Sequence, residues 1–337
     1  MKAVGCYRPL PIERPDALVD LDLEMPVAAG CDLLVKVEAV SVNPVDTKVR
    51  RRPNPDPDKP KILGWDAAGI VAAVGPDCRL FKPGDKVWYA GSIARPGSNS
   101  EFQLVDERIA GLMPKTLSFT EAAALPLTTI TAWEMLFDRF AIRIGKPAEA
   151  GAILIIGGAG GVGSIAIQLA RRLTGLTVIA TASRPETRDW CLALGAHHVI
   201  DHGKPLTEGL GALGFKTVEY VFSLTATDRH FPAIVEIVAP QGKFGLIDDP
   251  KTLDVLPFKR KSASIHWEFM YTRPVFATAD MIAQHRLLNE VAALVDDGLI
   301  RTTLAETMGK IDAATLKKAH ALVESGRARG KVVLAGF

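Results

Sequence analysis

The 337-residue sequence has few cysteines and spaces them far apart. Cys6, Cys31, Cys78 and Cys191 form no C-x-x-C motif and no closely spaced pair. This pattern argues against a disulfide framework and against a cysteine zinc cage. Buried free thiols are the expected state.

The sequence also has no large excess of positive or negative charge and no long apolar run. The 40 basic and 38 acidic residues leave a formal net charge of +2, too small to attract nucleic acid or an anionic membrane. No run of about 18 apolar residues could span a bilayer, and the start, MKAVGCYRPLP, lacks the apolar core of a signal peptide. We therefore expect a cytoplasmic protein that binds neither nucleic acid nor membranes.

The length favours two domains. In the first 110 residues, short β-rich runs bounded by Gly, Pro and Asp predict a small, mostly antiparallel barrel. From Ser118 the pattern becomes helical, with Ser118 and Glu121 spaced as a capping box, and a second helix is expected over about 131–140. A long helix at 281–295 and a terminal strand at 331–334 could close back onto the first domain.

The stretch from Ile153 to Ala170, ILIIGGAGGVGSIAIQLA, predicts a buried strand, a glycine turn and a helix. Gly158, Gly160 and Gly163 fit G-x-G-x-x-G, which admits a pyrophosphate to the bare backbone at a helix N-terminus. We expect the phosphate contacts at Gly158, Gly160, Gly161, Val162 and Gly163. The alternative is an ordinary glycine-rich loop.

Strands alternate with helical patterns after this turn, which predicts a doubly wound parallel sheet. The expected strands are 177–181, 198–200, 218–223, 242–247 and 264–270.

The residues at the end of the strand at 177–181 indicate whether the cofactor is NAD or NADP. NAD-binding domains place an acid about 20 residues beyond the glycines, and no acid occurs at 180–184. Ser183, Arg184 and Arg188 instead offer a hydroxyl and two guanidinium groups suited to a 2'-phosphate. NADPH is therefore the expected cofactor, although Arg188 could be only a solvated helix residue.

Two polar turns stand out in the first domain. Asn43 and Asp46 flank a proline turn where a strand ends, and Trp65 and Asp66 follow Gly64. Taken singly, such polar residues are more often turn or cap formers than catalysts. Both interpretations stay open at this point.

The barrel, then AAALPLTTITAWEML, GGAGGVGSIAIQLA, LGAHHVID and RGKVVL in this order, resemble the medium-chain dehydrogenase/reductase superfamily. The resemblance covers nearly the whole chain and is closest to the quinone oxidoreductase and zinc-type alcohol dehydrogenase-like branch. It implies an α/β protein with a GroES-like β-barrel catalytic domain from residues 1–128 and 279–337. It also implies a Rossmann NADP-binding domain over 129–278, and a homodimer joined through the strand at 265–271.

The resemblance also implies site residues. Quinone reductases carry Asn and Asp at the places of Asn43 and Asp46, and a Thr-rich turn near the nicotinamide at those of Thr128 and Thr131. A tyrosine against the 2'-phosphate in several relatives is replaced by His202, which either does the same or is an exposed structural histidine.

Three further points follow from the family pattern. We expect Lys331 of the RGKVVL motif to contact the cofactor. A tyrosine that often follows the Asn and Asp in relatives is missing, because none lies between Ser41 and Asp66. Asn43 and Trp65 occupy the places of a cysteine and a histidine that bind zinc in relatives, and a catalytic zinc needs three protein ligands. We therefore expect no metal.

Without a Lewis acid, the expected reaction is hydride transfer from NADPH to a quinone or an α,β-unsaturated carbonyl, which delocalises charge by itself. Asn43 would donate to the acceptor oxygen, and Asp46 would orient it or relay a proton. Trp65 and Trp267 would line the substrate pocket as flat apolar surfaces, unless they only pack in the core. The alternatives are an alcohol or aldehyde dehydrogenase and a non-catalytic NADPH sensor.

Overall fold

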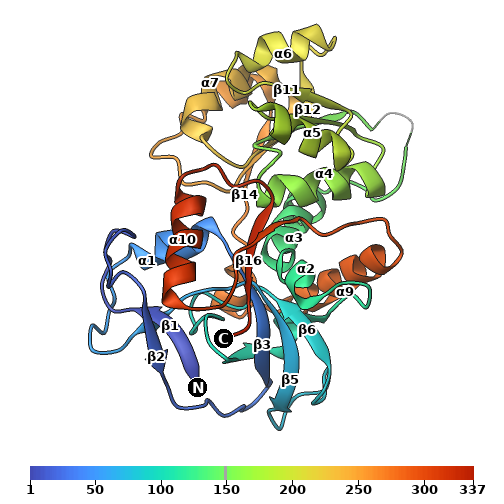
Figure 1. Cartoon of the computed structure of the whole chain (residues 1–337). Helices are drawn as coiled ribbons and strands as arrows, with labels where there is room; N and C mark the ends of the chain where they lie inside the picture. The colour runs from blue at the N-terminus through green and yellow to red at the C-terminus, as the bar shows by residue number, and fades with distance from the viewer. Residues whose placement is uncertain (148–149) are drawn as a thin grey trace. The chain divides into compact units, whose positions relative to one another are not determined.

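The computed structural model describes residues 1–147 and 150–337, and the chain divides into two compact units. Unit 1 comprises Met1–Ile130 and Tyr271–Phe337, so it is built from both ends of the chain, coloured blue and red in Figure 1. Unit 2 comprises Thr131–Met270. The predicted α/β class is confirmed.

Unit 1 contains two sheets. One has the order β2-β1-β4, and the other has the order β15-β16-β3-β5-β6-β8, with β7 also paired to β3. The strands are β1 (Lys2–Cys6), β2 (Val19–Asp22), β3 (Asp32–Val42), β4 (Lys61–Ile62), β5 (Ala67–Val74), β6 (Lys86–Tyr89), β7 (Phe102–Asp106), β8 (Ala110–Leu112), β15 (Leu304–Thr307) and β16 (Lys331–Ala335). The helices are α1 (Pro44–Arg50), the 3-10 turn η1 (Glu107–Ile109), α2 (Phe119–Ala123), α3 (Pro126–Trp133), which runs on into unit 2, α8 (Thr272–Phe276), α9 (Ile282–Asp296) and α10 (Ala313–Glu324).

The terminal strand closes unit 1. β16 pairs antiparallel with β3, Val332 opposite Val42, so residues almost 300 positions apart are neighbours. The expected return of the C-terminus to the first domain is confirmed. This pairing also sets Lys331 beside the end of β3.

Two helix starts follow from local hydrogen bonding. The predicted capping box of Ser118 and Glu121 is present at α2. At Asn43 we expected only a proline turn, and this was wrong: Asn43 precedes helix α1, with Pro44 at its first position. Proline suits that position because its missing N–H would have no helical partner there.

Unit 2 is a six-stranded parallel sheet with the order β11-β10-β9-β12-β13-β14, as predicted. Its elements are the π-helix η2 (Glu134–Arg139), β9 (Ala152–Ile156), α4 (Gly161–Leu173), β10 (Thr177–Thr181), α5 (Pro185–Ala193), β11 (His198–Ile200), α6 (Leu206–Ala212), β12 (Val218–Ser223), α7 (Thr227–Ile237), β13 (Val238–Leu246), the 3-10 turn η3 (Leu256–Lys261) and β14 (Ser264–Trp267).

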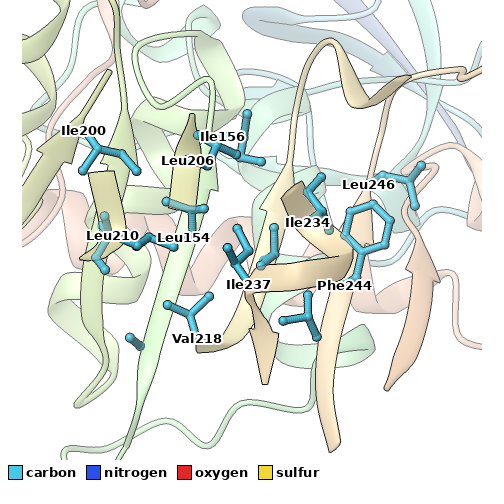
Figure 2. Packing of buried hydrophobic residues seen from close by; sticks show 14 of the residues in the cluster. Leu154, Ile156, Ile200, Leu206, Leu210, Val218, Ile234, Ile237, Phe244 and Leu246 are labelled. Atoms are coloured by element: carbon cyan, nitrogen blue, oxygen red, sulfur yellow. The ribbon is translucent and has the colours of Figure 1, made fainter. Parts of the chain in front are cut away.

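The core of unit 2 explains the unbroken apolar run of β9. Leu154 and Ile156 pack with Ile234 and Ile237 of α7 on one face of the sheet (Figure 2). Ile153 and Ile155 point to the opposite face, and all four strand residues are fully buried. Such a strand has no polar alternation because both of its faces are covered.

Two expected boundaries differ from the structure. The helix expected over 131–140 is α3 followed by η2, a change of winding that hydrophobic spacing does not reveal. β13 begins at Val238 and β14 ends at Trp267. Within the described residues no helix is long and apolar enough to cross a membrane.

Candidate active site

The glycine turn of unit 2 joins β9 to α4 and is tied to the end of β10. Gly157 has a φ of +86°, and its N–H donates to Thr181 Oγ1 at 3.0 Å. The N–H of Gly158 donates to the carbonyl of Thr181, also at 3.0 Å. These two bonds hold the turn that follows β9 against the end of the neighbouring strand β10.

The three motif glycines differ in what surrounds them. A Cβ on Gly163 would lie 2.5 Å from the carbonyl oxygen of Gly157, and one on Gly158 would lie 2.8 Å from the Cβ of Ala180. A Cβ on Gly160 would meet nothing nearer than 3.5 Å. Two glycines thus serve close packing, while Gly160 faces open space.

The open side of Gly160 lies at the N-terminus of α4. Gly161, Val162 and Gly163 form the first turn of this 13-residue helix, and this turn contains no acidic residue. N–H groups and the positive end of a helix dipole favour an anion at such a place. The predicted phosphate residues therefore lie together.

The predicted 2'-phosphate residues follow β10. Ser183 is exposed, and Arg184 lies 3.1 Å from Glu186 in an exposed ion pair. Arg188 donates from Nη1 to the carbonyl of Val199 at 2.6 Å. Arg188 therefore also holds α5 to β11, which the sequence did not indicate.

His202 is brought to the same corner. Its Nδ1 lies 2.9 Å from Thr181 Oγ1, the hydroxyl that accepts the N–H of Gly157. Its ring lies 6.2 Å from that of His230. Burial lowers the pKa of His202, and Asp201 opposes this, so a neutral imidazole stands beside the turn at pH 7.

In unit 1, Asn43 and Asp46 lie at the start of α1, and both are buried. The backbone N–H of Asn43 donates to Asp46 Oδ2 at 2.6 Å. The side-chain Nδ2 of Asn43 donates to Asp66 Oδ2 at 3.0 Å and to the Ser41 carbonyl at 3.3 Å. These bonds connect the two polar turns of the sequence.

Lys331 completes this group. Its Nζ donates to Asn43 Oδ1 and to the Val42 carbonyl at 3.2 Å, and it lies 3.2 Å from Asp66 Oδ2. Sequence spacing could not indicate these contacts. We call Asn43, Asp46, Asp66 and Lys331 the buried tetrad.

The tetrad changes the interpretation of Asn43. An amide has two N–H bonds, and those of Asn43 are directed at Asp66 and Ser41. The residue is 1% exposed. Donation to a substrate oxygen would therefore break one of these bonds, so Asn43 is better placed to hold the tetrad together.

Burial dominates the electrostatics of the tetrad. It raises the pKa of Asp46 to about 7, although the Asn43 N–H and Lys331 oppose it. Burial also raises the pKa of Asp66 and lowers that of Lys331, and each of these two groups opposes the shift of the other. Asp46 can therefore exchange a proton near neutral pH.

The remaining predicted residues are placed as follows. Thr128 and Thr131 are buried one turn apart on α3, with Thr128 Oγ1 donating to the Leu125 carbonyl at 3.0 Å. Trp65 is buried in unit 1, and its Nε1 donates to the Arg95 carbonyl at 3.3 Å. Trp267 belongs to unit 2, where it is exposed and lines a groove together with residues 248–253 and 255.

Sequence reasoning missed Tyr271. This residue is 2% exposed, and burial together with the charges of Asp46 and Asp66 raises its pKa well above the ordinary value. The family pattern predicts a tyrosine soon after Asn43 and Asp46, and none lies between Ser41 and Asp66. No sequence signal links position 271 to the tetrad, because the fold alone brings it there.

The tetrad does not fit a zinc site. The ammonium of Lys331 already occupies the space among the oxygens of Asn43, Asp66 and Val42. Outside residues 148 and 149, no three His, Cys, Asp or Glu side chains are grouped to hold a metal ion. Zinc binding also requires more nitrogen or sulfur ligands than this set provides. The absence of zinc stays a prediction.

Known proteins match the chain along its length. A family model for the alcohol dehydrogenase GroES-like domain matches residues 29–130, and one for zinc-binding dehydrogenases matches residues 194–334. A zinc-type alcohol dehydrogenase-like protein of Staphylococcus aureus strain MSSA476 is 40% identical over 338 residues, covering 99% of both chains.

Two solved structures extend the comparison. A protein of the zinc-dependent alcohol dehydrogenase type from Rhizobium etli CFN 42 has a TM-score of 0.96 and 61% identity, over 100% of this chain and 98% of that one. A quinone oxidoreductase of Pseudomonas syringae pv. Tomato DC3000 has a TM-score of 0.83 and 26% identity, over 99% of both chains. The chain therefore belongs to the medium-chain dehydrogenase/reductase superfamily of oxidoreductases, in its quinone oxidoreductase and zinc-type alcohol dehydrogenase-like branch.

Proposed function

We propose that this protein is an NADPH-dependent reductase that transfers a hydride to a quinone or an α,β-unsaturated carbonyl without a metal. The observation that carries the proposal is the corner of unit 2 formed by the glycine turn, the start of α4 and the end of β10. There the glycine turn is bonded to Thr181 at the end of β10. Ser183, Arg184 and Arg188 follow Thr181 in the chain, and no acid stands at 180–184, where NAD-binding domains place one.

The residues of this corner fit the two phosphate groups of NADPH. The first-turn N–H groups of Gly161, Val162 and Gly163 suit the pyrophosphate. Ser183, Arg184 and Arg188 suit the 2'-phosphate because guanidinium groups bind phosphate with paired, charge-assisted bonds. His202 would add one neutral N–H donor. When bound, NADPH supplies the hydride.

The acceptor class follows from the tetrad. Lys331 lies among the oxygens of the tetrad and Val42, which leaves no room there for a metal ion that would stabilise an alkoxide. An acceptor that spreads negative charge by itself therefore suits this chain better. The quinone oxidoreductase of Pseudomonas syringae is a relative with such an acceptor in its name. Asn43 would hold the tetrad, and Asp46 would supply the proton. Contacts of Thr128, Thr131 and Lys331 with the nicotinamide, and of either tryptophan with the substrate, stay predictions.

NADPH oxidation with a panel of quinones and enones, beside titrations of NADPH and NADH binding, tests the proposal. We expect turnover with several acceptors and tighter binding of NADPH. Oxidation of alcohols that depends on zinc would favour a zinc-type dehydrogenase. Cofactor binding without any turnover would favour a sensor.

We also propose a cytoplasmic homodimer joined through β14. This strand is at one end of the sheet order in unit 2, and Trp267 on it and Phe269 just after it are 56% and 47% exposed. Exposed sheet edges with aromatic residues favour pairing with another chain. Light scattering should give twice the monomer mass of 36.2 kDa, and Ile265→Pro should shift the mass to the monomer. A monomeric unmodified protein would contradict this proposal.

A further inference from the structure

Helix α5 lies against the glycine turn. Two consecutive residues of this helix, Trp190 and Cys191, connect it to the turn and to the helix that follows the turn. A Cβ on Gly158 would lie 3.2 Å from Cys191 Sγ, so the sulfur packs against the turn itself. Trp190 is half-buried, and its indole Nε1 lies 2.8 Å from Ser164 Oγ on α4. The helix that carries Arg188 therefore also supports the turn.

The hydrogen bonds that start at Trp190 run in one direction. An indole N–H donates and cannot accept, so Ser164 Oγ accepts from Trp190. The hydroxyl hydrogen of Ser164 is then directed to the carbonyl oxygen of Gly160, 2.7 Å from Ser164 Oγ. That carbonyl also accepts the backbone N–H of Ser164 at 2.9 Å. We call the Trp190 indole, the Ser164 hydroxyl and the Gly160 carbonyl the indole–serine relay.

The indole–serine relay ends on the peptide that joins Gly160 to Gly161. A trans peptide is planar, and its C=O and N–H point in opposite directions. Two hydrogen bonds hold the Gly160 carbonyl toward the body of α4, so the N–H of Gly161 is directed out of the helix N-terminus. Donation to the carbonyl also polarises the peptide and makes its N–H a stronger donor. No side chain at Gly160 caps this first turn.

We propose that Trp190 and Ser164 are positioning residues for the cofactor, which fix and polarise the Gly161 N–H so that it donates to the pyrophosphate. The inference rests on the proposed reductase function. The relay acts on the pyrophosphate, which NADPH and NADH share, and not on the 2'-phosphate, which only NADPH carries. Its loss should therefore weaken both cofactors by the same factor, whereas loss of Arg184 should weaken NADPH alone.

The test is calorimetric titration of the full-length protein with NADPH, NADH and adenosine 2'-monophosphate, which has a 2'-phosphate but no pyrophosphate. Ser164→Ala removes the hydroxyl, and Trp190→Phe removes the indole N–H and keeps an aromatic ring. Thr174→Val is the matched control. Thr174 is buried at the other end of α4, and its hydroxyl donates to the Ala170 carbonyl, four residues back, at 2.6 Å, as that of Ser164 does to Gly160.

We expect Ser164→Ala to weaken NADPH and NADH binding equally, by roughly three- to tenfold, the effect of one hydrogen bond. Binding of adenosine 2'-monophosphate should not change, and Thr174→Val should bind all three ligands normally. Trp190→Phe should show a smaller loss for both dinucleotides. Because Trp190 acts through Ser164, the double variant should lose no more than Ser164→Ala alone. Unchanged dinucleotide affinity in both single variants, additive losses, or a loss for NADPH alone overturns the inference, as does an equal loss for adenosine 2'-monophosphate.

A second readout needs no cofactor. Because the relay polarises the peptide, the amide 15N resonance of Gly161 should move upfield in Ser164→Ala and in Trp190→Phe, and stay in place in Thr174→Val. A resonance that moves in neither relay variant overturns the relay. Cofactor binding without turnover of any acceptor by the unmodified protein would overturn the proposed reductase, whereas the affinities would still decide the role of Trp190 and Ser164.

Discussion

Asn43 connects two turns that the sequence presents as separate. Its side chain bonds Asp66 and Lys331, and its backbone bonds Asp46. Each residue was recognisable as a candidate from its chemistry and position. Their mutual contacts were not, because Lys331 is 288 positions from Asn43 and no local pattern reports such a distance.

Asp46 should make the fold less stable as pH rises. Its pKa of about 7 in the folded chain exceeds the value of about 3.9 of an unfolded one. The folded chain therefore binds more protons between these values. This stabilisation is complete below about pH 4 and is lost as pH rises through about 7.

We expect Asp46→Asn to remove this loss. Between pH 5 and pH 8 the free energy of unfolding should fall by roughly 2–3 kcal/mol less than in the unmodified protein. Thermal unfolding at the two pH values measures the difference. Asp58→Asn, at an exposed position, should behave like the unmodified protein, and equal pH dependence in all three would refute the assignment.

Arg184 should carry much of the preference for NADPH. It lies at the N-terminus of α5, where its guanidinium lies 3.1 Å from the carboxylate of the exposed Glu186. A charge-assisted bond to phosphate contributes about 1.5 to 3 kcal/mol. Arg184→Ala should therefore weaken NADPH binding by roughly 10- to 100-fold and leave NADH binding unchanged.

Calorimetric titration with both cofactors measures this effect. Arg172→Ala, at the other end of α4 and exposed, is the matched control and should bind both cofactors as the unmodified protein does. Equal affinities of the unmodified protein for NADPH and NADH would sink the assignment.

At the scale of elements, the glycine turn predicts opposite outcomes for two similar substitutions. Gly163→Ala places a methyl group 2.5 Å from a backbone oxygen, which should destabilise the protein by about 1–3 kcal/mol. Gly160→Ala meets open space at an ordinary φ of −73°, so stability should be kept. Its methyl group would point to the phosphate site, and NADPH affinity should fall at least about tenfold.

Thermal unfolding and NADPH titration of both variants separate the two effects. If Gly160→Ala binds NADPH normally, the pyrophosphate does not bind at this turn and the assignment is wrong.

The elements themselves were predictable where one physical rule dominates. The strands expected at 177–181, 198–200 and 218–223 match β10, β11 and β12. In β10 the signal is the buried apolar run Val178–Ala180, which is typical of a covered parallel strand. α1 was missed because its seven residues are too few and too polar to show helical periodicity. The π-helix η2 could not be predicted either, because hydrophobic spacing does not distinguish it from an α-helix.

At the scale of the whole molecule, the order of motifs indicated the family, and the fold class followed from it. The site was predictable only in parts that lie close together in the chain. The glycine turn and the residues after β10 come from one βαβ segment. The tetrad draws on α1, the turn before β5 and β16, and Tyr271 comes from a fourth place, so only the folded chain could reveal it.

The central claim is metal-free hydride transfer from NADPH to an acceptor that spreads charge. Its most direct test is a single-turnover stopped-flow experiment with chelator-treated protein, zinc-analysed beforehand, using NADPH deuterated at C4 and a quinone. We predict full oxidation of one NADPH per chain, slowed by the deuterium that is transferred, with zinc far below one per chain. Oxidation that begins only after zinc is restored, or no oxidation with any quinone or enone, would contradict the account.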